Sequence, residues 1–181
     1  MRSREKYKYT PCYCEENVWH LCNDRIGYDG KAVFISNENK QCPMWNQRAA
    51  GGEEPVIWDY HVIYLSSIGN QWMILDLDTT LEFPSKPEVY LSASFPRRIR
   101  RGYEPVFRVV EADEFIAVFS SDREHMVLKD GKYSSSPPDW PLICRGTENN
   151  LDRFLDFRDS FVGEIVNLGE FKERFSGIHS Y

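Results

Sequence analysis

Three polar residues in this chain are of the types that a cysteine nucleophile, a proton carrier and an orienting carboxylate require. Cys14 opens a predicted helix, His61 lies inside an apolar segment, and Asp76 lies near the end of the next apolar segment. In a thiol-dependent enzyme the thiolate attacks the substrate, the imidazole moves protons, and the carboxylate holds the imidazole in one tautomer. The residue types therefore predict a thiol-nucleophile site, provided that the fold brings the three together.

The position of Cys14 has two opposing effects on its thiol. A helix N-terminus stabilises a thiolate through its partial positive charge, and its free N–H groups could also form an oxyanion hole. Glu15 and Glu16 follow directly, and two nearby carboxylates raise the pKa of a thiol unless they point away. By position alone, Cys14 could equally be a buried, inert cysteine.

Two apolar segments, 56–65 and 71–77, are predicted as neighbouring strands of a hairpin. The polar residues between them favour a four-residue loop over 67–70. Both segments are apolar at successive positions, so we expect both strands inside a sheet that is covered on its two faces.

This register would place His61 directly opposite Asp76, with the two side chains on one face about 5 Å apart. A slip of one residue would break the pairing. Asp59 and Asp78 would share the same face, so spacing alone leaves three aspartates as possible partners of the histidine.

A histidine inside an apolar strand needs a hydrogen-bond partner. Such histidines are more often structural than catalytic, and it is the predicted aspartate partner that favours a catalytic role for His61. The other histidines are expected on a helix surface (His20), in a loop (His125) and at the terminus (His179). None of these three is expected in the site.

Length and composition favour one soluble domain over residues 1–181, in which residues 1–8 form a flexible tail. The net charge of −6 argues against a general affinity for nucleic acids or anionic membranes, which require a basic surface. No segment approaches the ~20 apolar residues of a membrane span, and the charged N-terminus lacks the apolar centre of a secretory signal.

The five cysteines are an odd number in a chain that carries no evident secretory signal. The simplest interpretation is reduced thiols in the cytosol or nucleus. Cys12, Cys14, His20 and Cys22 could bind zinc only with help from elsewhere, because helical spacing puts Cys22 on the order of 12 Å from Cys14. We therefore do not expect a structural zinc site.

The remaining chain alternates short helices and strands with no repeats and no linker. Helices are predicted over 15–26, 87–95, 112–120, 151–157 and 169–175, and further strands over 31–36, 105–111 and 163–168. Residues 122–149 are rich in Ser, Pro, Gly and Asp and are expected mostly as loop. Helices that flank a mainly antiparallel sheet make an α+β sandwich.

Six motifs closely resemble the protein N-terminal glutamine amidohydrolases, in the order of that family and from about residue 9 to residue 175. The motifs are 12–17 (CYCEEN), 33–38 (VFISNE), 55–62 (PVIWDYHV), 76–79 (DLDT), 107–109 (FRV) and 121–126 (SDREHM). The resemblance implies an α-β-α sandwich like that of transglutaminases and papain-type proteases. It also implies conversion of an N-terminal glutamine to glutamate with release of ammonia, which marks a protein for arginylation and degradation.

By motif, the family's nucleophile falls on Cys14, its histidine on His61 and its acid on Asp76. The implied thiolate of Cys14 attacks the side-chain amide carbon, His61 protonates the departing ammonia, and water then hydrolyses the thioester. The implied chemistry needs neither a metal nor an organic cofactor. The implied partners are proteins or peptides with a free N-terminal glutamine, and the implied state is a monomer.

Specificity for a chain end requires a group that binds the free α-amine and a slot that admits only a terminus. A carboxylate suits the ammonium, and Glu38 or Asp59 could provide one. Tyr13, Trp45 or Trp58 could wall the slot. These five assignments rest on residue type and on proximity to the motifs.

Two alternatives remain open from the sequence. A cysteine peptidase or transglutaminase would share the fold and the three catalytic residues and act on other acyl groups. A non-catalytic interaction module would retain Cys14 and His61 for structural reasons alone.

Overall fold

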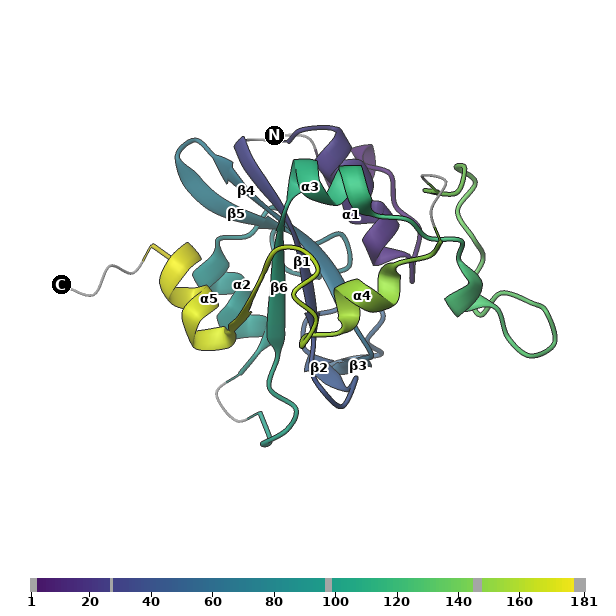
Figure 1. The fold of residues 1–181 in the computed structure, drawn as a ribbon. Helices are drawn as coiled ribbons and strands as arrows, with labels where there is room; N and C mark the ends of the chain where they lie inside the picture. Colours follow the sequence, from purple (N-terminus) through teal and green to yellow (C-terminus); the bar gives the residue numbers. More distant parts are fainter. Residues whose placement is uncertain (1–2, 27, 97–98, 145–147, 178–181) are drawn as a thin grey trace.

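The computed structural model describes residues 3–26, 28–96, 99–144 and 148–177, and its largest element is a five-stranded sheet (Figure 1). Neighbouring strands are antiparallel throughout, in the order β5-β4-β1-β6-β7. The strands of this sheet are β1 (Tyr28–Ser36), β4 (His61–Ile68), β5 (Gln71–Leu75), β6 (Val106–Glu111) and β7 (Glu164–Asn167). A separate two-stranded sheet is formed by β2 (Cys42–Met44) and β3 (Val56–Trp58).

Helices cover both faces of the large sheet (Figure 1). The α-helices are α1 (Cys14–Asn23), α2 (Pro87–Ser94), α3 (Ala112–Val118), α4 (Leu151–Leu155) and α5 (Leu168–Phe175), with short 3-10 turns η1 (Arg4–Lys6) and η2 (Glu124–Met126). The predicted helices are thus confirmed with somewhat different ends. The mixed, mainly antiparallel architecture confirms the α+β class.

The central strand β1 separates two hydrophobic clusters. Ala32 and Phe34 point to the cluster that contains residues of α1, α3 and α4, whereas Val33 and Ile35 point to the cluster with α2 and α5. All four side chains are fully buried. Successive side chains of a strand face opposite sides, so the part of β1 that is covered on both faces is apolar at four successive positions, Ala32 to Ile35.

The segment 56–65, predicted as one strand, is in fact divided between two sheets. β3 ends at Trp58 and pairs with β2, and β4 begins at His61. The break falls at Asp59, whose carboxylate accepts the N–H of Tyr60 at 2.9 Å and so turns the chain locally. The break places His61 at the beginning of β4.

The strand over 71–77 is also shorter than predicted and lies at a different place in the sheet. It forms β5, which ends at Leu75 and lies at one edge of the sheet, next to β4. The expectation of an interior position is therefore wrong for β5 and correct for β4. Because β5 ends early, Asp76 lies in the turn that follows it.

Arg108 fixes the segment around α4 against the sheet. Its guanidinium is fully buried and donates to four backbone carbonyls, those of Phe154, Asp156, Asp159 and Val162, at 2.7–2.9 Å. A buried guanidinium needs its donors satisfied, and carbonyl oxygens meet that need without an acidic partner. The segment 154–162 is thereby held in one conformation.

The N-terminal segment contacts the rest of the protein through Arg4, which donates to the carbonyl of Leu81 at 3.0 Å and lies over the ring of Phe83. The expected flexibility of residues 1–8 stays a prediction. Cys12, Cys14, Cys22 and Cys42 form no disulfide bond in the part of the chain that the structure describes. In the described ranges, no helix has the length and apolar character needed to cross a bilayer.

Candidate active site

Cys14 is the first residue of α1, as predicted, and its side chain reaches a cavity of about 400 Å³. The residue is almost fully buried, at 8% exposure. The thiol lies 3.6 Å from Oε2 of Glu15, which accepts a hydrogen bond from it. A thiol at a helix start beside a cavity is in a suitable position to attack a bound substrate.

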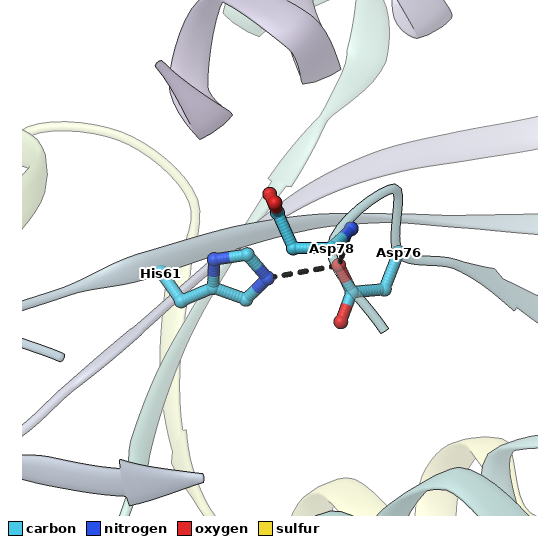
Figure 2. A group of neighbouring side chains, drawn as sticks. All are labelled: His61, Asp76 and Asp78. Atoms are coloured by element: carbon cyan, nitrogen blue, oxygen red, sulfur yellow. Dashed lines mark hydrogen bonds and ion pairs between the residues drawn. The ribbon is translucent and has the colours of Figure 1, made fainter. Parts of the chain in front are cut away.

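His61 and Asp76 form a buried hydrogen-bonded pair. Nε2 of His61 lies 3.0 Å from Oδ1 of Asp76, and both residues are 1% exposed (Figure 2). This contact uses Nε2 and leaves Nδ1 as the ring nitrogen that can exchange protons with other groups. The carboxylate therefore fixes the tautomer and orientation of the imidazole.

The hairpin that brings this pair together has a different register from the predicted one. Ile68 pairs with Gln71, so the loop contains only Gly69 and Asn70, both with φ near +60°. Glycine and asparagine tolerate this left-handed conformation, which two-residue hairpin turns of this kind require. The predicted loop over 67–70 is wrong by two residues.

A shift of two residues keeps every side chain on its expected face, which is why the predicted contact survives the error. Tyr64 pairs with Leu75, the last residue of β5, so His61 and Asp76 are not cross-strand partners. Asp76 instead reaches His61 from the turn after the strand.

Asp76 is held by four hydrogen bonds, two to each carboxylate oxygen. Oδ1 accepts from His61 and from the backbone N–H of Asp78 at 2.8 Å. Oδ2 accepts from Tyr90 at 2.8 Å and from Gln47 at 3.3 Å. A carboxylate with this many donors stays ionised and immobile.

The pKa values of His61 and Asp76 move in the directions expected of an ion pair. Burial opposes charge on both groups, but the Asp76 carboxylate raises the pKa of His61 and the imidazolium lowers the pKa of Asp76. The favourable charge interaction outweighs the cost of burial in each case. The pair is therefore poised to carry a proton on His61.

The thiol of Cys14 is not activated by its position in the way that a helix N-terminus suggests. Burial, followed by the Glu15 carboxylate, raises its pKa well above the usual value. Burial of the sulfur, together with the nearby Glu15 carboxylate, outweighs the effect of the helix N-terminus on the pKa of the thiol. The thiol is therefore neutral at rest and must lose its proton as it reacts.

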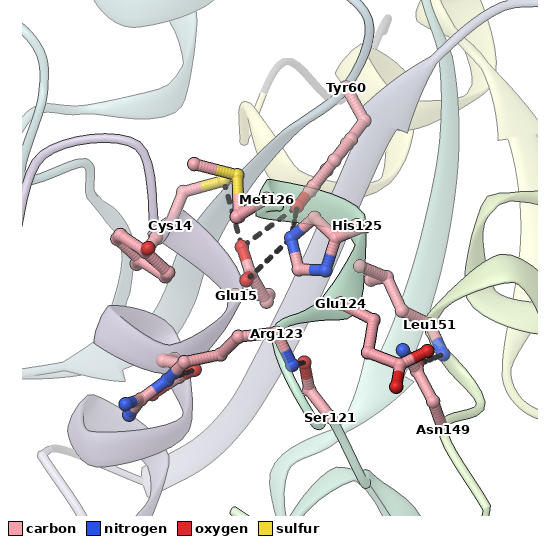
Figure 3. Close-up of polar contacts among 12 residues, drawn as sticks. Cys14, Glu15, Tyr60, Ser121, Arg123, Glu124, His125, Met126, Asn149 and Leu151 are labelled. Atoms are coloured by element: carbon pink, nitrogen blue, oxygen red, sulfur yellow. Dashed lines mark hydrogen bonds and ion pairs between the residues drawn. The ribbon is translucent and has the colours of Figure 1, made fainter. Parts of the chain in front are cut away.

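Glu15 itself is fully buried among three side chains that face the cavity. Its Oε2 accepts from Tyr60 at 3.0 Å, and its Oε1 lies 3.6 Å from Nε2 of His125 (Figure 3). Burial raises the pKa of Glu15 to about 7 and lowers the pKa of His125. Glu15 and His125 therefore meet near neutral pH as a partly protonated acid and a neutral base.

Glu16 is equally buried but faces the other way. Oε1 accepts from Nε of Arg123 at 2.6 Å, and Oε2 accepts from Nη2 of Arg123 at 2.7 Å and from Trp140 at 2.6 Å. Arg123 also donates to the carbonyls of Pro138 and Trp140. This cluster, which we call the Glu16 clamp (Glu16, Arg123 and Trp140), ties the segment 121–140 to α1.

The cavity beside Cys14 is walled by several parts of the chain. Its lining comprises Cys12, Cys14, Lys40, Trp58, Asp59, Tyr60, His61, Asp78, His125, Met126, Ser134, Leu151, Asp152 and Leu155. Cys14 and His61 thus line the same cavity, and Asp76 holds the histidine from outside the lining. This arrangement can perform nucleophilic attack followed by proton transfer.

Comparisons with known proteins agree with this chemistry. A model of the family described as N-terminal glutamine amidase matches residues 9–175, nearly the whole chain. The chain belongs to the N-terminal glutamine amidase family.

Three relatives match this family member over most of both chains. The protein N-terminal glutamine amidohydrolase of Bos taurus is 42% identical to it, over 96% of this chain and 89% of the relative. The proteins of the same name are 41% identical in Homo sapiens (95% and 89% covered) and 42% identical in Danio rerio (92% and 88% covered). The resemblance inferred from the six motifs is thus confirmed.

The structure brings two of the five predicted substrate-binding residues of this amidase family member to the cavity. Trp58 stacks on His61, with ring centroids 5.5 Å apart, and Asp59 also lines the cavity. Tyr13 is buried beneath and donates to the carbonyl of Ser135. Glu38 and Trp45 each line a different hollow. Substrate binding by any of the five stays a prediction.

Three residues of the site were missed by the sequence interpretation. His125 was expected in a loop away from the site, and instead it lines the cavity and contacts Glu15 and Tyr60. Glu15 shares helical spacing with the buried Val18, a signal that this carboxylate faces inward. Tyr60 and His125 lie in two of the motifs that carry the family resemblance, but their spacing gave no signal that either belongs to the site. His179 lies outside the described residues.

His61, Asp76 and Asp78 are also the one group of residues in the described ranges whose types and spacing could hold a metal ion, with ligand atoms within 4.8 Å of one another (Figure 2). The two oxygens of Asp76 already accept four hydrogen bonds, and Nε2 of His61 is part of that set. The donors present suit an orienting hydrogen-bond network better than a coordination sphere.

Proposed function

We propose that this chain converts the N-terminal glutamine of a protein or peptide to glutamate and releases ammonia. Membership of the amidase family and the names of the relatives support the substrate and the reaction. The observation that carries the proposal is that Cys14 and His61 line one cavity while Asp76 orients His61 from behind.

In the proposed first step, the Cys14 thiol gives its proton to Nδ1 of His61 as the sulfur attacks the side-chain amide carbon. The C–S bond forms, and the tetrahedral oxyanion accepts hydrogen bonds from N–H groups at the start of α1. The imidazolium then gives its proton to the amide nitrogen as the C–N bond breaks, and ammonia leaves. Asp76 stabilises the imidazolium throughout.

In the second step, a water molecule gives a proton to His61 and its oxygen adds to the γ-glutamyl thioester. The C–S bond breaks, the Cys14 sulfur recovers the proton from the imidazolium, and glutamate remains at the chain end. The raised pKa of the Cys14 thiol makes the sulfur a poor leaving group unless it is reprotonated, so His61 acts in both steps.

Around this chemistry we infer a single domain over residues 1–181 with a core like that of transglutaminases and papain-type proteases. The proposed product, an N-terminal glutamate on the substrate, would make the substrate protein a target for arginylation and degradation. A monomer in the cytosol, with access to the nucleus, fits this role.

Mass spectrometry on three peptides tests the reaction. Peptides with N-terminal glutamine, N-terminal asparagine or internal glutamine are incubated with the protein and with its Cys14→Ala variant. Conversion of the first peptide alone, and its loss in the variant, is the expected result. Conversion of internal glutamine or cleavage of the peptide would favour the transglutaminase or peptidase alternative. Folded protein that converts no peptide would favour the interaction module.

A further inference from the structure

Asp78 is a buried carboxylate that the mechanism does not use. It is 6% exposed and lines the cavity that Cys14 and His61 share. One of its oxygens lies within 4.8 Å of a ring nitrogen of His61. A buried carboxylate is costly unless a partner compensates its charge, so its presence beside the reacting groups calls for a function.

The carboxylate of Asp78 has few hydrogen-bond and ion-pair partners. Oδ1 accepts one hydrogen bond, from the hydroxyl of Tyr9 at 2.5 Å. In the part of the chain that the structure describes, no lysine or arginine nitrogen lies within 4.0 Å of this carboxylate. Asp76, two residues earlier, has all its acceptors occupied, and Figure 2 shows the Asp78 carboxylate turned away from it. Asp78 therefore retains an oxygen for a ligand.

The other carboxylates of the cavity wall are less suitable for a buried cation. Asp59 and Asp152 are both exposed, so water screens their charge. Glu15 is fully buried and stands behind Tyr60 and His125, which separate it from the cavity. Asp78 alone among these combines burial with a position on the lining.

We propose that Asp78 binds the α-ammonium group of the substrate's N-terminal glutamine and so reads the free chain end. This inference rests on the proposed function and names a group for its specificity. The α-nitrogen and the side-chain amide carbon of glutamine are separated by three carbons, a span of about 4–5 Å. An ammonium on Asp78 therefore leaves the amide carbon within reach of Cys14 and His61.

The charge balance of the site supports this assignment. Burial raises the pKa of Asp78, and a bound ammonium would compensate the charge of its carboxylate through charge-assisted hydrogen bonds. An internal glutamine offers an uncharged amide at that position. It also carries a preceding residue, which would have to occupy the space where Asp78 and Tyr9 meet.

The test measures the binding of two peptides to the Cys14→Ala protein, which cannot turn over. One peptide begins with glutamine, and the other has the same sequence with a 4-carbamoylbutanoyl cap, which keeps the amide but lacks the amine. We expect the glutamine peptide to bind at least tenfold more tightly. Adding Asp78→Asn, which keeps an acceptor for Tyr9, should weaken the glutamine peptide alone and remove the difference. Adding Asp59→Asn should preserve it.

Several results would overturn the assignment. These are equal affinity of the two peptides for Cys14→Ala, a difference that persists with Asp78→Asn, or a difference that disappears with Asp59→Asn. If Asp78 served only His61, its replacement would change turnover of Cys14-bearing protein and leave both affinities intact.

A second variant covers the case in which Asp78→Asn does not fold. Asp78→Glu keeps the charge but moves it by one methylene, and it should weaken the glutamine peptide more than the capped one. Equal weakening of both would contradict the proposal. Failure of the proposed function is separate, since it would appear as no deamidation by the Cys14-bearing protein.

Discussion

The Glu16 clamp and the catalytic wall, by which we mean Cys14, His61, Asp76 and Asp78, both bury carboxylates, but the two regions use them differently. Glu16 accepts three hydrogen bonds and neutralises Arg123. Asp78, on the catalytic wall, accepts one hydrogen bond, and among the described residues no lysine or arginine nitrogen lies within 4.0 Å of its carboxylate, with Arg48 acting on it only from farther away. A carboxylate with a complete set of partners fixes structure, whereas one with a spare oxygen can bind a ligand.

The clamp nevertheless contributes to the site from a distance. It ties the segment 121–140 to α1, the helix that begins with Cys14, and this segment supplies His125, Met126 and Ser134 to the cavity wall. We therefore expect variants of the two regions to have different effects. Changes on the catalytic wall should lower the rate with little loss of stability, and changes in the clamp should lower stability.

The largest effect on rate should come from Cys14→Ala, because no other group in the mechanism can form the thioester. We expect kcat to fall by on the order of 10⁴-fold or more, with the free energy of unfolding nearly unchanged. Cys12→Ala is the matched control, since Cys12 also lines the cavity and is exposed. Ammonia release is measured for both variants. An inactive Cys12→Ala protein beside an active Cys14→Ala protein would contradict the assignment of Cys14 as the nucleophile.

Asp76→Asn should lower kcat by roughly 10²–10⁴-fold, because an amide cannot stabilise the imidazolium and favours the wrong tautomer of His61. The pH dependence of kcat/KM should change as well, since the carboxylate raises the pKa of His61. If Asp76→Asn did not fold, or if it folded and kept full activity, the main role of Asp76 would be structural and not catalytic.

Arg123→Ala should cost about 3–5 kcal/mol of stability, because it leaves the fully buried Glu16 without a counter-charge. Arg158→Ala is the control. Arg158 pairs with Asp156 at the surface, where an ion pair contributes only about 0–1 kcal/mol. Denaturant unfolding measures both variants. Equal losses would contradict the distinction between the clamp and ordinary surface pairs.

We expect the smallest effect from Glu15→Gln, and this effect should appear in how the free energy of unfolding depends on pH. Its pKa is raised from 4.5 to about 7, so the folded protein binds a proton between these values that the unfolded chain has released. Wild-type stability relative to Glu15→Gln should therefore fall by roughly 2–4 kcal/mol as the pH rises from 4.5 to 7, then level off. A constant difference between the two proteins would show that folding does not raise the pKa of Glu15.

Much of the catalytic wall could be predicted because it depends on local signals. A polar residue inside an apolar segment is visible in the sequence, and the helix at Cys14 follows from its spacing. The prediction of the His61–Asp76 contact was correct although the predicted loop was wrong by two residues, because side chains two positions apart on a strand lie on the same face.

The loop error has a tertiary cause. Ser66 and Ser67 favour a loop by composition, yet both belong to β4, and Ser66 is fully buried and donates to the carbonyl of Ile26. This distant hydrogen bond satisfies a hydroxyl that the sequence alone leaves without a partner.

The surroundings of Glu15 and Glu16 could not be predicted for a similar reason. Their partners come from segments far along the chain, and only the packed fold brings His125 and Arg123 to α1. A glutamate in a first helical turn is normally solvated, so its burial has no strong local signal beyond its helical spacing.

Trapping the proposed thioester with hydroxylamine tests the central claim most directly. The protein is incubated with an N-terminal glutamine peptide and increasing hydroxylamine, and the products are separated by mass spectrometry. If Cys14 forms an acyl-enzyme, the share of N-terminal γ-glutamyl hydroxamate should rise with hydroxylamine at the expense of glutamate. Both products should disappear in Cys14→Ala. Glutamate as the sole product at every hydroxylamine concentration would contradict the thioester mechanism.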